Sequence, residues 1–203
     1  MAGAGLRPHL LAMHPRTALL GGLGAAAAAG GAFLAVAATN GEAPQPVPFS
    51  HAHHAGVLGI DCRHCHYLAE RSAWAGVPAM ETCMGCHYPV VARPRVEPLR
   101  WRRTVALQGF AYFDHSIHLA AGVGCSTCHG RVDRMDRVVS PQRMTMRWCL
   151  DCHRDPSPHL RPPGAVADMD WVPSAEQDRL GRQRMRARGI DPDRLTHCHA
   201  CHR

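Results

Sequence analysis

The sequence predicts a mainly α-helical and irregular fold with little or no β-sheet, preceded by one transmembrane helix near the N-terminus. Three observations lead to this prediction. The chain of 203 residues contains 19 glycines and 16 prolines, which favours loops and short helices over long regular elements. All ten cysteines fall in five short motifs of one kind. An uncharged segment of 21 residues lies near the start of the chain.

The uncharged segment covers residues 18–38. As a helix it would be about 31 Å long, enough to cross a bilayer. Arg7 and Arg16 precede it and Glu42 follows, so the positive-inside rule predicts a cytoplasmic N-terminus. The alternative is a cleaved signal peptide, with Ala35-Val36-Ala37 as the cleavage site. The length of the apolar stretch favours a retained, single-pass anchor in the inner membrane.

Small side chains dominate this anchor. Gly22, Ala26 and Gly30 recur at every fourth position, a spacing that allows close contact between membrane helices. We therefore expect the anchor to pack on a membrane partner. The predicted division of the chain is a cytoplasmic N-terminus at 1–17, the anchor at 18–38 and a periplasmic domain at 40–203.

Each of the five motifs has the sequence Cys-x-x-Cys-His. Their cysteines and histidines are Cys62, Cys65 and His66; Cys83, Cys86 and His87; Cys125, Cys128 and His129; Cys149, Cys152 and His153; and Cys198, Cys201 and His202. In this pentapeptide the two thiols form thioether bonds to a haem, and the adjacent histidine is the proximal ligand of its iron. The sequence thus predicts five covalently bound haem c groups.

A zinc knuckle, a redox dithiol and a disulfide are the alternatives for a single Cys-x-x-Cys-His. A zinc site would pair two such motifs, and five is an odd number. A redox dithiol occurs once and needs no following histidine. Five copies that leave no cysteine over favour multihaem binding.

Chain length predicts that the haems form most of the core. About 165 residues follow the apolar segment, roughly 33 for each motif, which is too few to enclose each haem in a domain of its own. The aromatic content of 5% agrees with this, since porphyrin rings would replace large aromatic side chains.

The formal charge of +7 comes from arginine, because the chain has no lysine. Each ferric haem c adds about −1, so five would lower the net charge to roughly +2. We expect many arginines to pair with haem propionates, which match the planar guanidinium. Nucleic-acid binding is excluded on this basis.

An internal repeat predicts the distal ligands. Phe-x-His-x-x-His begins at Phe49 and again at Phe113, and each copy precedes two haem motifs. The domain thus consists of a two-haem module at 49–92, a second at 113–154 and a C-terminal fifth-haem segment at 195–203. Histidines at i and i+3 share a helix face and can serve two neighbouring irons. The four predicted distal ligands are His51, His54, His115 and His118.

The fifth distal ligand is predicted to be Met146, three residues before Cys149. A methionine ligand raises the potential of a haem relative to two histidines. Met80 occupies the equivalent position in the first module and stays an alternative, and further candidates are His159, His197 and His199. His53 and His64 fall outside the repeated pattern, which predicts propionate or surface roles for them.

These motifs resemble the pentahaem cytochrome c subunit of alternative complex III, a quinol:electron acceptor oxidoreductase. The resemblance is dense over about 49–155 and looser at the C-terminal Cys-His-x-Cys-His-Arg. The stretches that carry it are 49–56, 59–66, 75–78, 82–87, 112–118, 122–132 and 146–154. A sister family, the menaquinone reductase complex of sulfate reducers, has a related six-haem subunit, whereas this chain has five motifs.

The resemblance implies a class III cytochrome-like haem arrangement, one N-terminal transmembrane helix and a methionine ligand at Met146. It also implies electron relay within a respiratory or photosynthetic membrane complex. Electrons from menaquinol oxidation would pass to a monohaem cytochrome c subunit, a soluble cytochrome c or a blue copper protein. The partners would be the iron–sulfur and integral membrane subunits, and this chain would carry no catalysis of its own.

Two alternatives remain. A stand-alone, membrane-anchored cytochrome could oxidise quinol itself, and its purified form would be reduced by menaquinol. A catalytic multihaem reductase would need a five-coordinate haem, which a high-spin signal or carbon monoxide binding would reveal.

Overall fold

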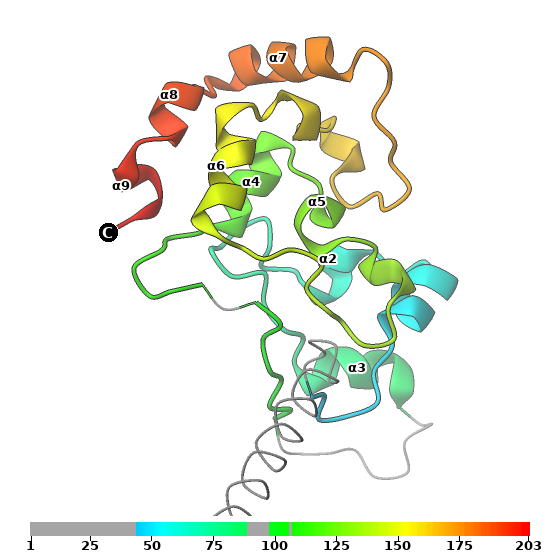
Figure 1. Ribbon diagram of the computed structural model, residues 1–203. Coiled ribbons are helices and arrows are strands. Elements are labelled where there is room, and N and C mark those ends of the chain that lie inside the picture. Colours follow the sequence, from blue (N-terminus) through cyan, green and yellow to red (C-terminus); the bar gives the residue numbers. More distant parts are fainter. Residues whose placement is uncertain (1–43, 89–97, 106) are drawn as a thin grey trace, which may run out of the picture. The chain divides into compact units, whose positions relative to one another are not determined.

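Short helices joined by irregular segments make up the part of the chain that the computed structural model describes, residues 44–88, 98–105 and 107–203 (Figure 1). The helical elements are, in order, η1 (Ala52–Val57), α2 (Cys62–Cys65), α3 (Met80–His87), α4 (His115–Ala121), α5 (Cys125–His129), η2 (Val132–Arg134), α6 (Met146–Arg154), η3 (Ser157–His159), η4 (Pro163–Ala165), α7 (Gln177–Arg188), α8 (Pro192–Leu195) and α9 (Cys198–Cys201). These described residues form no strand, and two isolated antiparallel bridges join Ala111 to His202 and Val123 to Leu160. The predicted helical and irregular character is confirmed there.

Polar side chains cap the N-termini of several of these helices. The carboxylate of Asp61 accepts a hydrogen bond from the backbone of Arg63 at the start of α2, and that of Asp114 does the same for Ser116 in α4. The hydroxyl of Thr145 accepts from Trp148 in α6. Such caps satisfy N–H groups that have no partner within the helix. Two helices that hold a motif, α2 and α6, and the His-x-x-His helix α4 therefore have local signals that set where each begins.

The main buried cluster lies where α7 packs on η3. Gly181 of α7 makes this possible, since a Cβ at this position would collide with the carbonyl oxygen of Ser157. The buried side chain of Gln177 donates hydrogen bonds to the carbonyls of Ser157 at 3.1 Å and Leu160 at 2.8 Å. Leu160 itself is 1% exposed. These contacts hold the C-terminal third of the chain against the segment that follows α6.

From α7 the chain continues through α8 to α9 along one rim of the described unit (Figure 1). Helix α8 packs on α6. Near the last residues, the backbone N–H of Tyr112 donates to the carbonyl of Cys201 at 2.6 Å. The fifth motif thus lies beside the segment that leads into α4.

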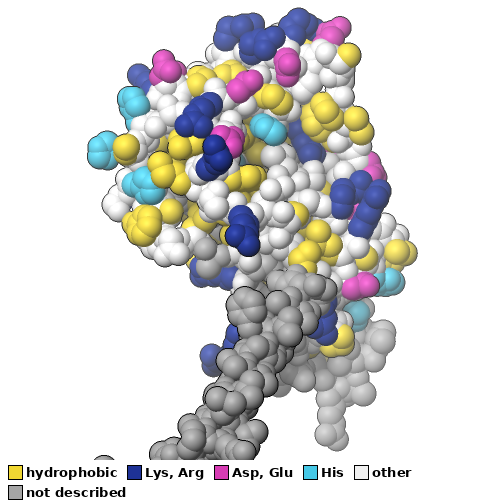
Figure 2. Space-filling view, viewed as in Figure 1, with side chains coloured by type: hydrophobic (Ala, Val, Ile, Leu, Met, Phe, Trp, Pro, Cys, Tyr) yellow, Lys and Arg dark blue, Asp and Glu magenta, His cyan; other side chains and the backbone are white. Residues whose placement is uncertain are grey.

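Apolar side chains are distributed unusually for a domain of this size. Among the described residues the buried hydrophobic side chains are Ala69, Leu160 and Val166. Many large apolar residues lie on the surface instead, and Figure 2 shows them in several patches. The most exposed include Val57, Tyr88, Ile117, Met146 and Val172. This distribution fits the prediction that bound cofactors form most of the core.

The described helices are all too short or too polar to span a bilayer. The predicted anchor at 18–38 lies outside the described residues.

Candidate haem centres

The two His-x-x-His segments make matching ring contacts, although η1 is a π-helix and α4 an α-helix. His51 precedes η1, and His115 begins α4. In the first copy Phe49 lies edge-on to His51 at 4.8 Å and stacks on His54 at 4.5 Å between ring centroids. In the second copy Phe113 makes the same two contacts with its histidines, at 4.8 and 4.5 Å. The phenylalanine of the repeat therefore orients both imidazoles in each module.

Each of these four imidazoles lies opposite the histidine of one Cys-x-x-Cys-His motif. In the first module the rings of His51 and His66 are parallel within 2° with centroids 6.5 Å apart, and those of His54 and His87 are 6.0 Å apart and tilted by 42°. In the second module the pairs, parallel within 6° and 22°, are His115 with His129 at 6.3 Å and His118 with His153 at 6.1 Å. In both modules the first histidine of the repeat faces the first motif and the second faces the second motif.

This spacing fits one metal ion between each pair. With metal–nitrogen distances of about 2.0–2.1 Å on both sides, two imidazoles on opposite sides of an ion have ring centroids roughly 6 Å apart. Direct stacking would bring the rings much closer. The residues present therefore fit iron ligation by two histidines at four positions.

Hydrogen bonds at Nδ1 orient most of these rings. Nδ1–H of His54 donates to the carbonyl of Ser50 at 2.8 Å, and that of His118 donates to Asp114 at 2.7 Å, four residues back in each copy. The carbonyls of Gly76, Ala73 and Leu195 accept from His66, His115 and His153 at 2.7, 2.8 and 3.2 Å. A ring that donates through Nδ1 keeps the Nε2 lone pair for a metal.

Burial keeps several of these histidines neutral. Desolvation, together with the neighbouring rings of His66 and His54, lowers the pKa of His51 to about 4. Desolvation likewise lowers the pKa of His118 and of His129. Neutral imidazole is the form that binds metal.

The two cysteines of each motif lie on one turn of helix. At i and i+3 both sulfur atoms lie on the same helix face, as two thioether bonds to one porphyrin edge require. The motifs begin α2, α5 and α9, end α3 and lie within α6. Met80 and Met146 are the first residues of α3 and α6, so they occupy equivalent places.

The influence of one motif's thiols on the pKa of another motif's thiols indicates which motifs are neighbours in space. A hydrogen bond between Cys62 and Cys125 raises the pKa of Cys125, which brings the first and third motifs together. Burial and then the neighbouring Cys83 raise the pKa of Cys65, which connects the second motif to the first. Burial and the neighbouring Cys152 raise the pKa of Cys128, which connects the third motif to the fourth. Burial and the neighbouring Cys201 raise the pKa of Cys149, which connects the fourth motif to the fifth. The order is therefore second, first, third, fourth, fifth.

The fifth motif lacks the arrangement seen in the other four. In the described residues His202 faces the ring of Phe110, with centroids 5.7 Å apart, and its Nδ1 lies 3.3 Å from the Phe110 carbonyl. Met146 is 62% exposed. The structure therefore pairs the four predicted distal histidines but leaves the choice among Met146, Met80 and the other candidates a prediction.

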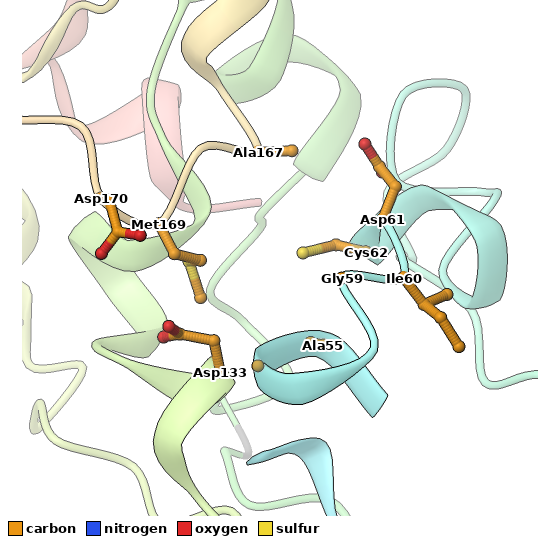
Figure 3. Close-up of a pocket in the computed structure, with 10 residues that line it drawn as sticks. Ala55, Gly59, Ile60, Asp61, Cys62, Asp133, Ala167, Met169 and Asp170 are labelled. Carbon is orange, nitrogen blue, oxygen red and sulfur yellow. The ribbon is translucent and has the colours of Figure 1, made fainter. Parts of the chain in front are cut away.

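A cavity of about 270 Å³ lies beside the first motif (Figure 3). The thiol of Cys62 points into it, toward Met169. Its walls come from six residues within 55–62, from Asp133 and from three residues within 167–170. Residues between the fourth and fifth motifs thus reach the first motif.

Two groups of residues at these centres could not be found from the sequence. The carbonyls that orient the rings belong to positions with no chemical signature. Arg161, buried beside the third motif, is one arginine among 23. The phenylalanine contacts could have been found, because Phe49 and Phe113 are part of the repeat.

Comparison with known proteins supports a multihaem cytochrome c. The chain is 27% identical over 173 residues to the multiheme cytochrome c subunit of menaquinone reductase from Nitratidesulfovibrio vulgaris, a match that covers 78% of this chain and 67% of that protein. No family model matches the chain. The similarity to a multihaem cytochrome c agrees with the five motifs.

Proposed function

We propose that this chain is the pentahaem electron-transfer subunit of a membrane complex of the alternative complex III type. It would pass electrons from menaquinol oxidation to a periplasmic cytochrome c or blue copper protein. The observation that carries the proposal is the pairing of four motif histidines with the four histidines of the repeat at 6.0–6.5 Å. The quinone-linked relative supports the membrane complex.

Ligation would follow the ring pairs. His51 and His54 would be distal ligands for the motifs that end at His66 and His87, and His115 and His118 for those that end at His129 and His153. Met146 would serve the fifth. The anchor at 18–38 would hold the domain at the periplasmic face of the inner membrane, beside iron–sulfur and integral membrane subunits.

The residues of this chain would bind and orient the cofactors, and they would leave no iron with a free ligand position. Bound haem c supplies one-electron Fe(III)/Fe(II) chemistry. Menaquinol oxidation at partner subunits releases two electrons and two protons, and each electron would leave singly to a one-electron acceptor. With two protein ligands at each iron, the chain would offer no position for a substrate, so it would act as a relay and not as an enzyme by itself.

Three measurements on the complex purified from native membranes test this proposal. Mass spectrometry of this chain should show five covalent haems. Low-temperature EPR with a redox titration should show low-spin haems, four with two histidine ligands and one with histidine and methionine. Menaquinol should reduce all of them in the intact complex. A chain without covalent haem, or one that menaquinol cannot reduce in the complex, would contradict the proposal.

A second candidate is electron flow in the opposite direction, into menaquinone. The name of the relative favours it, since that protein belongs to a menaquinone reductase. Initial rates distinguish the two. Faster reduction of cytochrome c by menaquinol supports the first candidate, and faster reduction of menaquinone by a reduced periplasmic cytochrome supports the second.

Two further alternatives have their own tests. If the isolated subunit were reduced by menaquinol as fast as the complex, it would be a quinol dehydrogenase by itself. If the native reduced protein bound carbon monoxide readily, an open haem would indicate a catalytic reductase.

A further inference from the structure

The segment after η3 folds back over the third haem motif. The backbone N–H of Arg161 donates to the carbonyl of Gly122 at 2.7 Å, and the N–H of Cys125 donates to the carbonyl of Val166 at 3.0 Å. These two bonds hold Arg161 next to the first cysteine of the motif.

The guanidinium of Arg161 is buried between the residues on either side of Cys125. Its NH2 donates to the hydroxyl of Ser126 at 2.6 Å, and its NH1 donates to the carbonyls of Ala165 at 3.1 Å and Asp168 at 2.6 Å. Its central carbon lies 4.6 Å from the ring centroid of Trp171. The residue is 4% exposed, and its Nε is buried with no hydrogen-bond partner in the described part of the chain.

The backbone next to Cys125 leaves room for the guanidinium of Arg161. Gly124 precedes Cys125, and a Cβ at Gly124 would collide with this guanidinium. None of the ion pairs found among the described residues includes Arg161, and the carboxylate of Asp168 acts on it only at longer range. Burying a cation without a direct counter-ion is costly. The two carbonyls, the Ser126 hydroxyl and the Trp171 ring offset part of this cost, and they keep the positive charge at a fixed place.

That place is the junction of the two modules. The segment that carries Arg161 continues to 167–170, which lines the cavity into which Cys62 of the first motif points (Figure 3). The charge therefore lies near the thioether positions at which the first and third motifs meet.

We propose that Arg161 raises the redox potential of the haem bound at Cys125 and Cys128. It thereby sets the potential difference between this haem and the neighbouring haem of the first module. This rests on the proposed haem binding. The ferrous haem carries one positive charge less than the ferric haem, so a nearby cation favours reduction. Inside a protein, where the effective dielectric constant is low, such an interaction is much stronger than in water.

The test is a spectroelectrochemical titration of Arg161→Gln in the full chain. We expect the reduction equilibrium of one haem to fall about tenfold, which is about 59 mV for one electron. Arg161→Lys, which keeps the charge, should stay within about threefold of the wild type. The matched control is Arg179→Gln on α7, whose side chain is 62% exposed and should change no potential.

A second pair of variants leaves Arg161 in place. Ser126→Asp puts a carboxylate at the group that accepts from NH2 and should lower the potential of the same haem, whereas Ser126→Asn should not. This pair decides the matter if Arg161→Gln does not fold.

Haem content separates the possible failures. If mass spectrometry shows no covalent haem on the wild-type chain, the proposed function itself is wrong. If all haems are present and neither Arg161→Gln nor Ser126→Asp changes the reduction equilibrium constant of any haem by more than twofold, only the role of Arg161 is wrong. Equal shifts in Arg161→Gln and Arg161→Lys would also overturn it, because hydrogen bonding and not charge would then be responsible.

Discussion

The two modules and the C-terminal motif contain the same pentapeptide in different settings. In the modules, every proximal histidine faces an imidazole from a Phe-x-His-x-x-His segment. At the C-terminus, His202 faces the ring of Phe110 in the described structure. In the proposed arrangement the pentapeptide provides attachment and one ligand, and a separate helix provides the second. The Phe-x-His-x-x-His sequence that would supply this helix occurs twice, and the fifth motif lies outside the repeat.

The difference extends to how the parts are held. In both modules the repeat's phenylalanine and the carbonyl four residues before the second histidine orient that ring. In the second module, His115 and His153 donate instead to Ala73 and Leu195, outside the module. The C-terminal motif depends on elements distant in sequence, through α7 on η3 and Tyr112 on Cys201. We expect the modules to tolerate changes in the C-terminal segment better than that segment tolerates loss of its contacts.

The largest effect should come from removing a module's distal ligand. His54→Ala should leave one haem without its sixth ligand, because His54 is the ring that faces His87. EPR should then show one high-spin haem, and carbon monoxide should bind to it. The adjacent His53→Ala is the matched control, and it should leave every haem low-spin. High-spin signals in both variants, or in neither, would contradict the pairing.

The next prediction concerns the C-terminal motif and its methionine. Met146→Ala should abolish the histidine–methionine signal and leave four bis-histidine haems unchanged, since only the fifth motif lacks a histidine partner among the described residues. Met80→Ala removes the methionine at the equivalent place in α3 and should leave the spectrum intact. Loss of the signal in Met80→Ala instead would mean that Met80, and not Met146, is the methionine ligand.

A smaller effect is expected at the contact between α7 and η3. Gly181→Ala should destabilise the C-terminal segment by about 1–2 kcal/mol, because a clash costs up to about 3 kcal/mol while alanine gains about 1 kcal/mol in helix propensity. Urea unfolding of the loaded protein measures this. Gly164→Ala, at a site with open space around it, is the control. Equal stability of the two variants would show that α7 does not need this close approach.

The smallest effect should test the equivalence of the modules. Phe49→Leu and Phe113→Leu each remove an aromatic contact with two imidazoles, at a cost of about 0.5–1.5 kcal/mol. The histidine contacts match, but Phe49 also lies edge-on to Trp101 at 6.0 Å. In urea unfolding the two losses should therefore agree within about 1.5 kcal/mol, with Phe49→Leu the larger. A large difference would mean that the repeated sequence is not energetically repeated.

Much of the fold class, and the histidines that form the ring pairs, could be predicted from local sequence. The Gly and Pro content and the short spacing within each pentapeptide predicted short helices, and helices begin at all five motifs or contain them. The Phe-x-His-x-x-His repeat predicted which histidines come together in pairs on one helix face. The partner of Met146 could not be predicted in the same way, because nothing in the sequence repeats around the fifth motif.

By itself the sequence determined the number of motifs, the duplication and the four candidate distal histidines. Those features depend on spacing within a few residues, which backbone geometry converts directly into side-chain position. Only the tertiary structure decided which histidine faces which motif, the spatial order of the motifs and the burial of Arg161 beside Cys125. These depend on contacts between residues tens of positions apart, such as His115 with Ala73 and Cys62 with Cys125, and such contacts arise only when the whole chain packs.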